Sequence, residues 1–170
     1  MSILEIKNCF DPVLRKKCAQ VKNVDEALEN LTQDMIETMF DASGVGLAGN
    51  QIGLAQRLIV VDMGFGTDKP DPITILNPVI SASEEKVSGE EGCLSIPEIT
   101  ADVTRAAMVE VKGMDLAGKD VRYEVDGFLA RAFQHELDHL DGKLFWDYLG
   151  KMKRDVLQRK FRKMLKEHEQ

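Results

Sequence analysis

The chain is poor in the residues and patterns that mark secreted or membrane-spanning proteins. Only three of its 170 residues are cysteine, at irregular spacing, which argues against a disulfide framework and suits a reducing compartment. No apolar stretch approaches the roughly 20 residues needed to span a bilayer. The N-terminal segment lacks the apolar run of a signal peptide and the length and composition of a transit peptide. We therefore expect a cytoplasmic protein without membrane contact.

Aromatic residues are also scarce, at 6%, but the chain has enough aliphatic side chains to bury a core. Hydrophobic residues make up 44% of the chain and charged residues 30%, which excludes wholesale disorder and low-complexity architecture. With 22 basic and 29 acidic residues, the net charge is −7. The length fits one ordinary domain.

Three helices are predicted from apolar periodicity and from signals at their ends. A capping box at Asn23 and Glu26 precedes leucine and methionine at helical spacing, which predicts a helix over residues 24–41. The segment between Asp126 and Gly142 is predicted as the second helix, and residues 151–169 as the third.

The predicted strands form antiparallel sheets. Apolar runs at 58–61 and 73–80 indicate two strands, and Pro78 marks the second as an edge strand because proline cannot donate to a ladder. Alternating segments at 108–112 and 121–125 flank a turn and predict a hairpin. We therefore predict an α+β fold in which antiparallel sheets pack around the second helix, with the third helix at the C-terminus.

The second predicted helix carries the most informative motif, HELDH, which has the HExxH pattern. At about 100° per residue, His135 and His139 share a face and can bind one cation. Glu136 lies about 100° from His135, where it can take a proton from water bound to that cation. Chance is the alternative. However, the chain has only three histidines, and burying two of them in this apolar helix costs several kcal/mol without a partner.

A third protein ligand is expected because catalytic metal sites usually keep three ligands and one open position. The candidate is Cys93, which follows Gly92 in the segment EEGCLSIPE. Cys9 and Cys18 lie beside apolar residues and are expected to be small buried residues. A structural thiol is the alternative for Cys93, but no downstream His or Glu of the zinc-protease kind is evident, which favours ligation.

The segment 44–53, GVGLAGNQIG, contains four glycines. It lacks the Lys-Ser/Thr that follows a phosphate-binding loop. Glycines permit a backbone to run close beside an extended ligand, and Gln51 offers a neutral amide donor suited to a developing oxyanion. An ordinary flexible loop is the alternative.

Taken in order, GVGLAGNQ at 44–51, EGCLS at 91–95 and QHELDH at 134–139 closely resemble the three signature motifs of the peptide deformylase family. The resemblance covers nearly the whole chain. It departs from the family pattern at Gly49, where the family usually has alanine, and this bears on the position of Gln51. The resemblance implies removal of the formyl group from the N-terminal methionine of newly synthesised polypeptides.

The resemblance also implies a role for each site residue. Cys93, His135 and His139 would hold one divalent metal ion, and Glu136 would act as general base and then acid. The oxyanion would be bound by Gln51 and by the backbone N–H of Leu94. The peptide main chain and the methionine side chain would be contacted by Val45, Gly46, Gly92, Phe128 and Ala132.

Metal identity is left open by the ligand types, since a thiolate with two imidazoles accepts iron(II), zinc, nickel or cobalt. The resemblance implies iron(II) as the physiological ion. It also implies a supporting ion pair between Arg105 and Glu91, for which two solvated surface charges are the alternative. Asp138 could orient a ligand histidine or pair with Arg131, and the sequence does not choose between these.

The C-terminal segment is basic. Residues 151–170 contain eight Lys or Arg and three acidic residues, a net charge of +5 that leaves −12 for the rest. A cationic helix on an anionic body suits contact with RNA, and the resemblance implies a ribosome contact, although a solvated face is the alternative. We predict a catalytic domain at 1–149 and a basic helix at 150–170, both parts of a single domain, in a monomeric protein.

Two other functions share parts of this pattern. A zinc endopeptidase carries the same two-histidine helix but would cleave internal peptide bonds and release no formate. A structural metal site in an RNA-binding protein would need a fourth protein ligand, for which only Cys9 or Cys18 could be invoked. Formate release from a formyl-Met peptide separates these alternatives.

Overall fold

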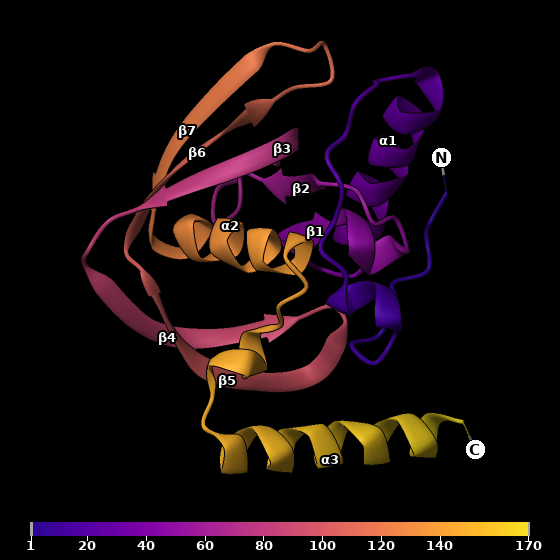
Figure 1. Cartoon of the computed structure of the whole chain (residues 1–170), viewed down its shortest axis with the longest axis vertical. Helices are drawn as coiled ribbons and strands as arrows, with labels where there is room; N and C mark the ends of the chain where they lie inside the picture. The colour runs from indigo at the N-terminus through magenta and orange to yellow at the C-terminus, as the bar shows by residue number, and fades with distance from the viewer. Residues whose placement is uncertain (1, 170) are drawn as a thin grey trace.

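Helix α2, Gly127–Leu140, lies between two antiparallel sheets and is covered on nearly every side (Figure 1). The computed structural model describes residues 2–169. Ala130 and Phe133 of α2 are fully buried against the larger sheet, where they pack with Ile59, Ile75 and Val111. The predicted α+β fold around this helix is confirmed.

The larger sheet has five strands in the order β1-β2-β3-β6-β7, and all neighbours are antiparallel. The predicted hairpin is confirmed, because Met108 pairs with Asp126 at one end and Met114 with Asp120 at the other. The strands are β1 (Gly46–Ala48), β2 (Leu58–Asp62), β3 (Pro72–Ala82), β6 (Met108–Met114) and β7 (Asp120–Asp126).

Strand β3 lies in the middle of this sheet, so the prediction of an edge strand was wrong. The ladder between β3 and β6 is irregular between Leu76 and Val79, and this bulge contains Pro78. At the bulge Asn77 has a left-handed backbone, with φ of 51°, and its amide group bonds the backbone of Val21. A bulge leaves a residue unpaired, which lets a proline sit in an internal strand.

The second sheet was not predicted and consists of β4 (Lys86–Cys93) and β5 (Ile96–Ala106). Six of the eight β4 residues are charged, polar or glycine, so the strand lacks an apolar period. It forms because it pairs along its length with β5, whose Ile99, Ala101 and Val103 are buried. Strand β4 therefore depends on tertiary contacts for its conformation.

The helices match their predicted positions with one correction at a cap. Helix α1 spans Glu26–Asp41, and its N-cap is Asp25, whose carboxylate accepts a hydrogen bond from Leu28 N at 2.8 Å. The capping box proposed at Asn23 was therefore wrong. Helix α3 spans Lys151–His168. Three short 3-10 helices complete the structure: η1 (Pro12–Arg15), η2 (Gly49–Ile52) and η3 (Phe145–Tyr148).

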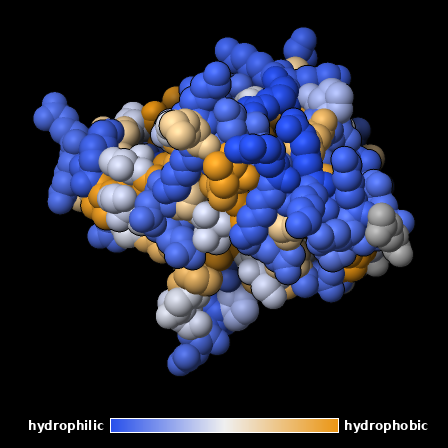
Figure 2. Space-filling model, turned by 90° about the horizontal axis from the view of Figure 1, so that it is seen from below, coloured by the Kyte–Doolittle hydropathy of each residue, from blue (hydrophilic) through white to orange (hydrophobic). Residues whose placement is uncertain are grey.

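Helix α3 runs beside the β4–β5 sheet, on the side away from α2 (Figure 1). Phe161 is 1% exposed and packs in a core cluster with Leu14, Ile96, Phe145 and Trp146. The face of the molecule seen from below is mostly hydrophilic, with scattered apolar side chains (Figure 2). Within residues 2–169, no helix combines the length and apolar content needed to cross a membrane.

Candidate metal centre and active site

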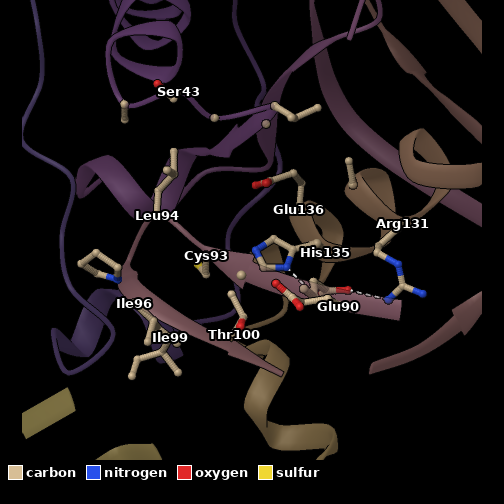
Figure 3. Close-up of a pocket in the computed structure, with 18 of the residues that line it drawn as sticks. Ser43, Glu90, Cys93, Leu94, Ile96, Ile99, Thr100, Arg131, His135 and Glu136 are labelled. Carbon is tan, nitrogen blue, oxygen red and sulfur yellow. Dashed lines mark hydrogen bonds and ion pairs between the residues drawn. The ribbon is translucent and has the colours of Figure 1, made fainter. Parts of the chain in front are cut away.

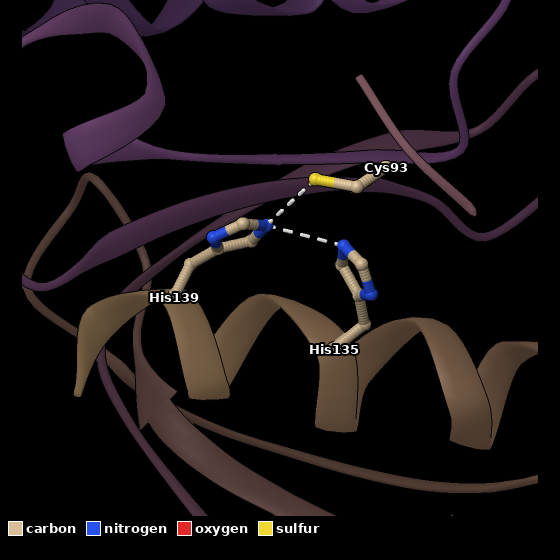
Figure 4. A group of neighbouring side chains, drawn as sticks. All are labelled: Cys93, His135 and His139. Carbon is tan, nitrogen blue, oxygen red and sulfur yellow. Dashed lines mark hydrogen bonds between the residues drawn. The ribbon is translucent and has the colours of Figure 1, made fainter. Parts of the chain in front are cut away.

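Three side chains from distant parts of the sequence converge as predicted. Cys93 at the end of β4 and His135 and His139 on α2 place their ligand atoms within 4.8 Å of one another (Figure 4). His139 Nε2 lies 3.2 Å from Cys93 Sγ and 3.1 Å from His135 Nε2. Both histidines are buried and Cys93 is partly exposed. One sulfur and two imidazole nitrogens at these separations form a candidate site for a transition-metal ion.

The local structure explains how Cys93 reaches the histidines. The register of β4 against β5 shifts between Gly92 and Cys93, so that Cys93 pairs with Ile96 across a tight turn. The turn begins with Leu94, which is partly buried against the core cluster that also contains Met39 of α1. The strand therefore ends with its thiol turned toward α2.

Glu91 orients the imidazole of His135. Its Oε2 lies 2.8 Å from His135 Nδ1, which leaves Nε2 of that ring free to bind a metal. The same carboxylate accepts hydrogen bonds from Arg105 Nε at 3.0 Å and Arg105 Nη2 at 2.6 Å. Burial alone would raise the pKa of Glu91, but the hydrogen bonds from His135 and Arg105 lower it to about 2. The implied ion pair between Arg105 and Glu91 is present.

Arg131 is a second cation that forms an ion pair with Glu91. Its Nη1 lies 3.1 Å from Glu91 Oε1 and donates to the carbonyl of Val103, while Nη2 donates to the carbonyl of Val87. The guanidinium packs against Gly89, where a Cβ would lie 3.1 Å from Nη2. Arg131 thus joins α2 to both strands of the smaller sheet, and no sequence pattern indicated these partners.

Asp138 pairs with neither of the groups that the sequence suggested. Its carboxylate lies 2.5 Å from Arg105 Nη1 and accepts a hydrogen bond from the hydroxyl of Tyr148 at 2.7 Å. Burial and this hydrogen bond raise the pKa of Tyr148 to about 12. Arg105 therefore links two carboxylates. One is Glu91 on β4, which orients His135, and the other is Asp138, three residues after His135 on α2.

Glu136 is buried beside the metal ligands and has an unpartnered oxygen. It is 4% exposed, and among residues 2–169 no side chain or backbone group bonds its Oε2. Burial is the main cause that raises its pKa to about 7. Figure 3 shows its carboxylate projecting from α2 into the cavity. A buried carboxylate without a protein partner, next to three ligand atoms, fits a site that holds a hydrated cation.

Gln51 is placed by the 3-10 turn η2 and is 1% exposed. Its Oε1 accepts a hydrogen bond from Ala48 N at 2.9 Å, while Nε2 lies 3.1 Å from Ser95 Oγ and 3.7 Å from Cys93 Sγ. The amide is thus fixed with its donor end toward Cys93. Ser95 was not singled out from the sequence, although it belongs to the EGCLS motif.

Gly49 does not loosen the turn that carries Gln51. A Cβ at Gly49 would lie 2.7 Å from the carbonyl oxygen of Gln56 and 3.0 Å from that of Leu54. The chain therefore closes tightly on Gly49. The departure from the family pattern coincides with a close backbone approach that only glycine permits without a shift.

A cavity of about 510 Å³ opens beside these groups (Figure 3). Its lining includes every residue that the sequence analysis assigned to metal binding, catalysis or substrate contact except His139, which has no exposed surface. Sequence reasoning missed several other lining residues, among them Ser43, Pro97, Ile99, Thr100 and Arg131.

The other two cysteines, Cys9 and Cys18, are buried as expected. Burial raises the pKa of the Cys9 thiol to about 12.

An α+β fold that brings a thiol, two imidazoles and a buried glutamate together at a cavity defines a metal-dependent hydrolase. The family model for polypeptide deformylase matches residues 3–155. Peptide deformylase from Syntrophobacter fumaroxidans is 47% identical over 98% of each chain, and that from Thermodesulfovibrio yellowstonii is 45% identical over 95% of this chain and 98% of the relative.

Solved structures agree with the sequence relatives. A peptide deformylase from Legionella pneumophila superposes with a TM-score of 0.93 and 43% identity, covering 99% of both chains. A peptide deformylase from Ehrlichia chaffeensis in complex with actinonin gives a TM-score of 0.90 at 37% identity, covering 96% of this chain and 98% of that one. The chain belongs to the peptide deformylase family.

Proposed function

We propose that this chain hydrolyses the formyl group from the N-terminal methionine of newly synthesised polypeptides. Family membership supports this reaction, and one observation of the structure carries it. The Cys93, His135 and His139 ligand atoms meet at a cavity into which the unpartnered carboxylate of Glu136 projects. This arrangement provides a cation site and a proton carrier on the same side of a bound substrate.

The donor set supports a catalytic metal with an open position, and we propose iron(II) as the physiological ion. When bound, a divalent cation supplies Lewis-acid activation of the formyl carbonyl and of a water molecule. Zinc, nickel and cobalt suit the same ligands, because sulfur with imidazole nitrogen does not select among them. Metal analysis of protein purified without oxygen tests the assignment.

Glu136 is proposed as the proton carrier. It takes a proton from the attacking water and passes it to the amine that leaves. A pKa near 7 suits both roles, because the group then exchanges a proton readily at neutral pH. Its buried position keeps bulk water from competing for that proton.

Gln51 Nε2 and the backbone N–H of Leu94 are proposed to donate hydrogen bonds to the oxygen on which negative charge develops. The position of Gln51 supports this role, because its Oε1 is anchored by Ala48 and its donor end faces Cys93. Removing one such donor raises the activation barrier by about 3 to 4 kcal/mol.

The peptide main chain is proposed to lie between β1 and β4. Both are edge strands of their sheets, and residues of both line the cavity. An extended peptide pairs with such edges through main-chain hydrogen bonds, and we assign these contacts to Val45, Gly46 and Gly92. Phe128 and Ala132, which line the cavity from α2, are assigned to the methionine side chain.

Formate release tests the reaction. Iron-loaded protein, kept anaerobic, is expected to release formate from formyl-Met-Ala-Ser and to leave the internal bonds of an acetylated peptide intact. Glu136→Gln keeps the size of the side chain but removes the proton carrier, so activity is expected to fall at least a hundredfold. Cleavage of the acetylated peptide without formate release would instead support the endopeptidase alternative.

We further propose that α3 contacts the ribosome, supported by its net positive charge on an anionic body. Truncation after Leu149 is a poor test, because it removes the core residue Phe161. Neutralising the exposed Lys153, Lys160 and Lys163 to glutamine removes charge and leaves the buried face intact.

The charge-neutralised variant is expected to lose salt-sensitive co-sedimentation with ribosomes. A matched control neutralises three exposed lysines elsewhere, Lys16, Lys17 and Lys119. Equal co-sedimentation of both variants would refute the contact. A single domain, a cytoplasmic location and a monomeric state remain predictions, and light scattering in solution tests the monomer.

A further inference from the structure

The 3-10 helix η3 contacts helix α2, which carries two of the metal ligands, through two aromatic side chains. Phe145 and Tyr148 are three residues apart, so they project from the same side of a 3-10 helix. The Phe145 ring is 1% exposed and lies 6.4 Å from the ring of His135, centroid to centroid, at an interplanar angle of 26°. The hydroxyl of Tyr148 donates to Asp138, the residue before His139. Neither aromatic residue belongs to the three motifs, yet both reach the part of α2 that carries the ligands.

Other contacts fix η3 to the body of the protein. The carboxylate of Asp147 accepts hydrogen bonds from Leu144 N at 2.9 Å and from Arg15 Nη1 at 2.7 Å and Nη2 at 3.1 Å. Trp146 is 1% exposed and packs in a core cluster. The backbone of η3 is therefore held without help from the Tyr148 side chain, which can be changed without unmaking the turn.

Tyr148 contacts Arg105 in two ways. The guanidinium carbon lies 4.8 Å from the centre of the Tyr148 ring, over its face, where a cation is attracted by the ring quadrupole. The Tyr148 hydroxyl donates at 2.7 Å to Oδ2 of Asp138, and the same oxygen accepts a hydrogen bond from Arg105 Nη1 at 2.5 Å. The ring thus restrains the plane of the guanidinium, and the hydroxyl restrains the carboxylate that binds one of its edges.

Arg105 passes this restraint on to the metal ligand His135. Its Nε and Nη2 bind the two oxygens of Glu91 as a planar fork, so a tilt of the guanidinium moves both hydrogen bonds together. Oε2 of Glu91 in turn lies 2.8 Å from His135 Nδ1. Arg105 and Glu91 are both buried, so bulk water does not readily replace a lost bond. The position of His135 Nε2, 3.1 Å from His139 Nε2 (Figure 4), therefore depends on a series of directional contacts that begins at Tyr148.

We propose that Tyr148 is a positioning residue for the metal centre: it holds Arg105 in place, and Arg105 acts through Glu91 to keep the His135 imidazole in the orientation that binds the cation. This inference rests on the proposed metal-dependent function. Loss of the group that orients a ligating histidine typically lowers metal affinity roughly ten- to a hundredfold. Because Tyr148 acts through two intervening side chains, its removal is expected to weaken metal binding about tenfold, the lower end of that range.

The test measures the affinity of the metal-free protein for cobalt(II) by competition with a chromophoric chelator, a readout that does not depend on activity. Tyr148→Phe keeps the ring over Arg105 and removes the hydroxyl, whereas Tyr148→Leu removes both contacts. We expect Kd for cobalt(II) to rise about threefold in Tyr148→Phe and about tenfold in Tyr148→Leu. We also expect the absorption bands of bound cobalt(II) to shift, and kcat of the cobalt-saturated protein to fall with KM unchanged, because the ligand geometry changes while the substrate contacts do not.

Tyr123 provides the matched control, because it is the other tyrosine of the chain and packs against the core cluster between α2 and the larger sheet, outside this series of contacts. Tyr123→Leu is expected to lower thermal stability and to keep the wild-type Kd for cobalt(II), which separates positioning from a general loss of stability. A wild-type Kd in Tyr148→Leu, or an equal increase of Kd in both leucine variants, overturns the proposed role of Tyr148.

Failure of the proposed function gives a different result. If the wild-type protein releases no formate while its cobalt(II) affinity depends on Tyr148, the deformylase reaction is overturned and the positioning role is supported. If the wild-type protein does not bind cobalt(II), the metal centre is overturned and the positioning role with it.

Discussion

Gly46 is the residue whose size bears most directly on Glu136. A Cβ there would lie 2.9 Å from both Cγ and Oε1 of Glu136, which is too close for ordinary contact. We expect Gly46→Ala to displace the Glu136 side chain and to lower kcat more than tenfold, while the fold persists because the displaced group is flexible.

Gly150→Ala provides the comparison, since a Cβ at Gly150 meets no atom within 4 Å. Steady-state formate release and thermal unfolding are measured for both variants. Wild-type activity in Gly46→Ala would show that Glu136 does not need this space.

Tyr148 gives a residue-scale prediction about pH. Its pKa of about 12 lies above the ordinary value of 10, because the phenol is partly buried and donates to Asp138. The neutral phenol therefore stabilises the fold fully below about pH 10, and this contribution is lost as the pH rises to about 12. Phenolate absorbance is expected to show a step near pH 12 that Tyr148→Phe lacks and Tyr123→Phe retains. Persistence of the step in Tyr148→Phe would contradict the assignment.

At the scale of elements, Glu91 joins strand β4 to helix α2 and to strand β5. Its carboxylate is shared by His135, Arg105 and Arg131, and it is 6% exposed. Glu91→Gln would leave the buried guanidinium of Arg131 without the carboxylate it pairs with, and would leave Arg105 with Asp138 as its ion-pair partner. We expect a loss of about 3 to 5 kcal/mol in the free energy of unfolding, measured with urea.

Glu90→Gln is the matched control, because the neighbouring Glu90 is exposed and belongs to no ion pair among residues 2–169. Its unfolding midpoint is expected to stay near that of the wild type. Equal stability of the two variants would show that Glu91 contributes only to orienting His135.

The elements also show which local patterns are informative. The β6–β7 hairpin is predicted by alternating apolar and polar residues, and helix α2 by apolar residues at helical spacing. Both patterns are informative because each element buries its apolar face against a neighbour. Strand β4 was not predicted, because its residues are mainly charged, polar or glycine and show no apolar period. Its conformation depends on pairing with β5. Pro78 led to the wrong prediction of an edge strand for a similar reason. A bulge in the ladder with the neighbouring strand accommodates the proline, and the sequence of β3 alone does not reveal it.

For the whole molecule, the three ligands come from two elements of the fold, so metal binding is expected to stabilise all of it. A cation that binds only the folded state adds about 2.7 kcal/mol when present at a hundredfold excess over Kd. Adding zinc to metal-free protein is therefore expected to raise Tm by about 5 to 10 °C.

Cys93→Ser is expected to remove most of this increase, whereas Cys18→Ser, at a buried thiol outside the ligand set, is expected to keep it. Calorimetry with and without a chelator measures the difference. An equal rise in both variants would place the stabilising cation elsewhere.

The sequence by itself determined the residues that carry the chemistry. The spacing of His135 and His139 fixes them on one face of a helix, and Glu136 beside them follows from the same geometry. The three ordered motifs also identified the family. These features are local, so they are present in the chain before it folds.

Only the tertiary structure decided how these residues are held. The partners of Glu91, the pairing of Asp138 with Arg105 and Tyr148, and the contact between Phe65 and Phe128 all join segments far apart in the chain or on different elements. No periodic pattern encodes such contacts, because they depend on which surfaces meet when the sheets close around α2. Local sequence patterns therefore identify the residues that carry the chemistry, while the positions of their side chains depend on tertiary packing.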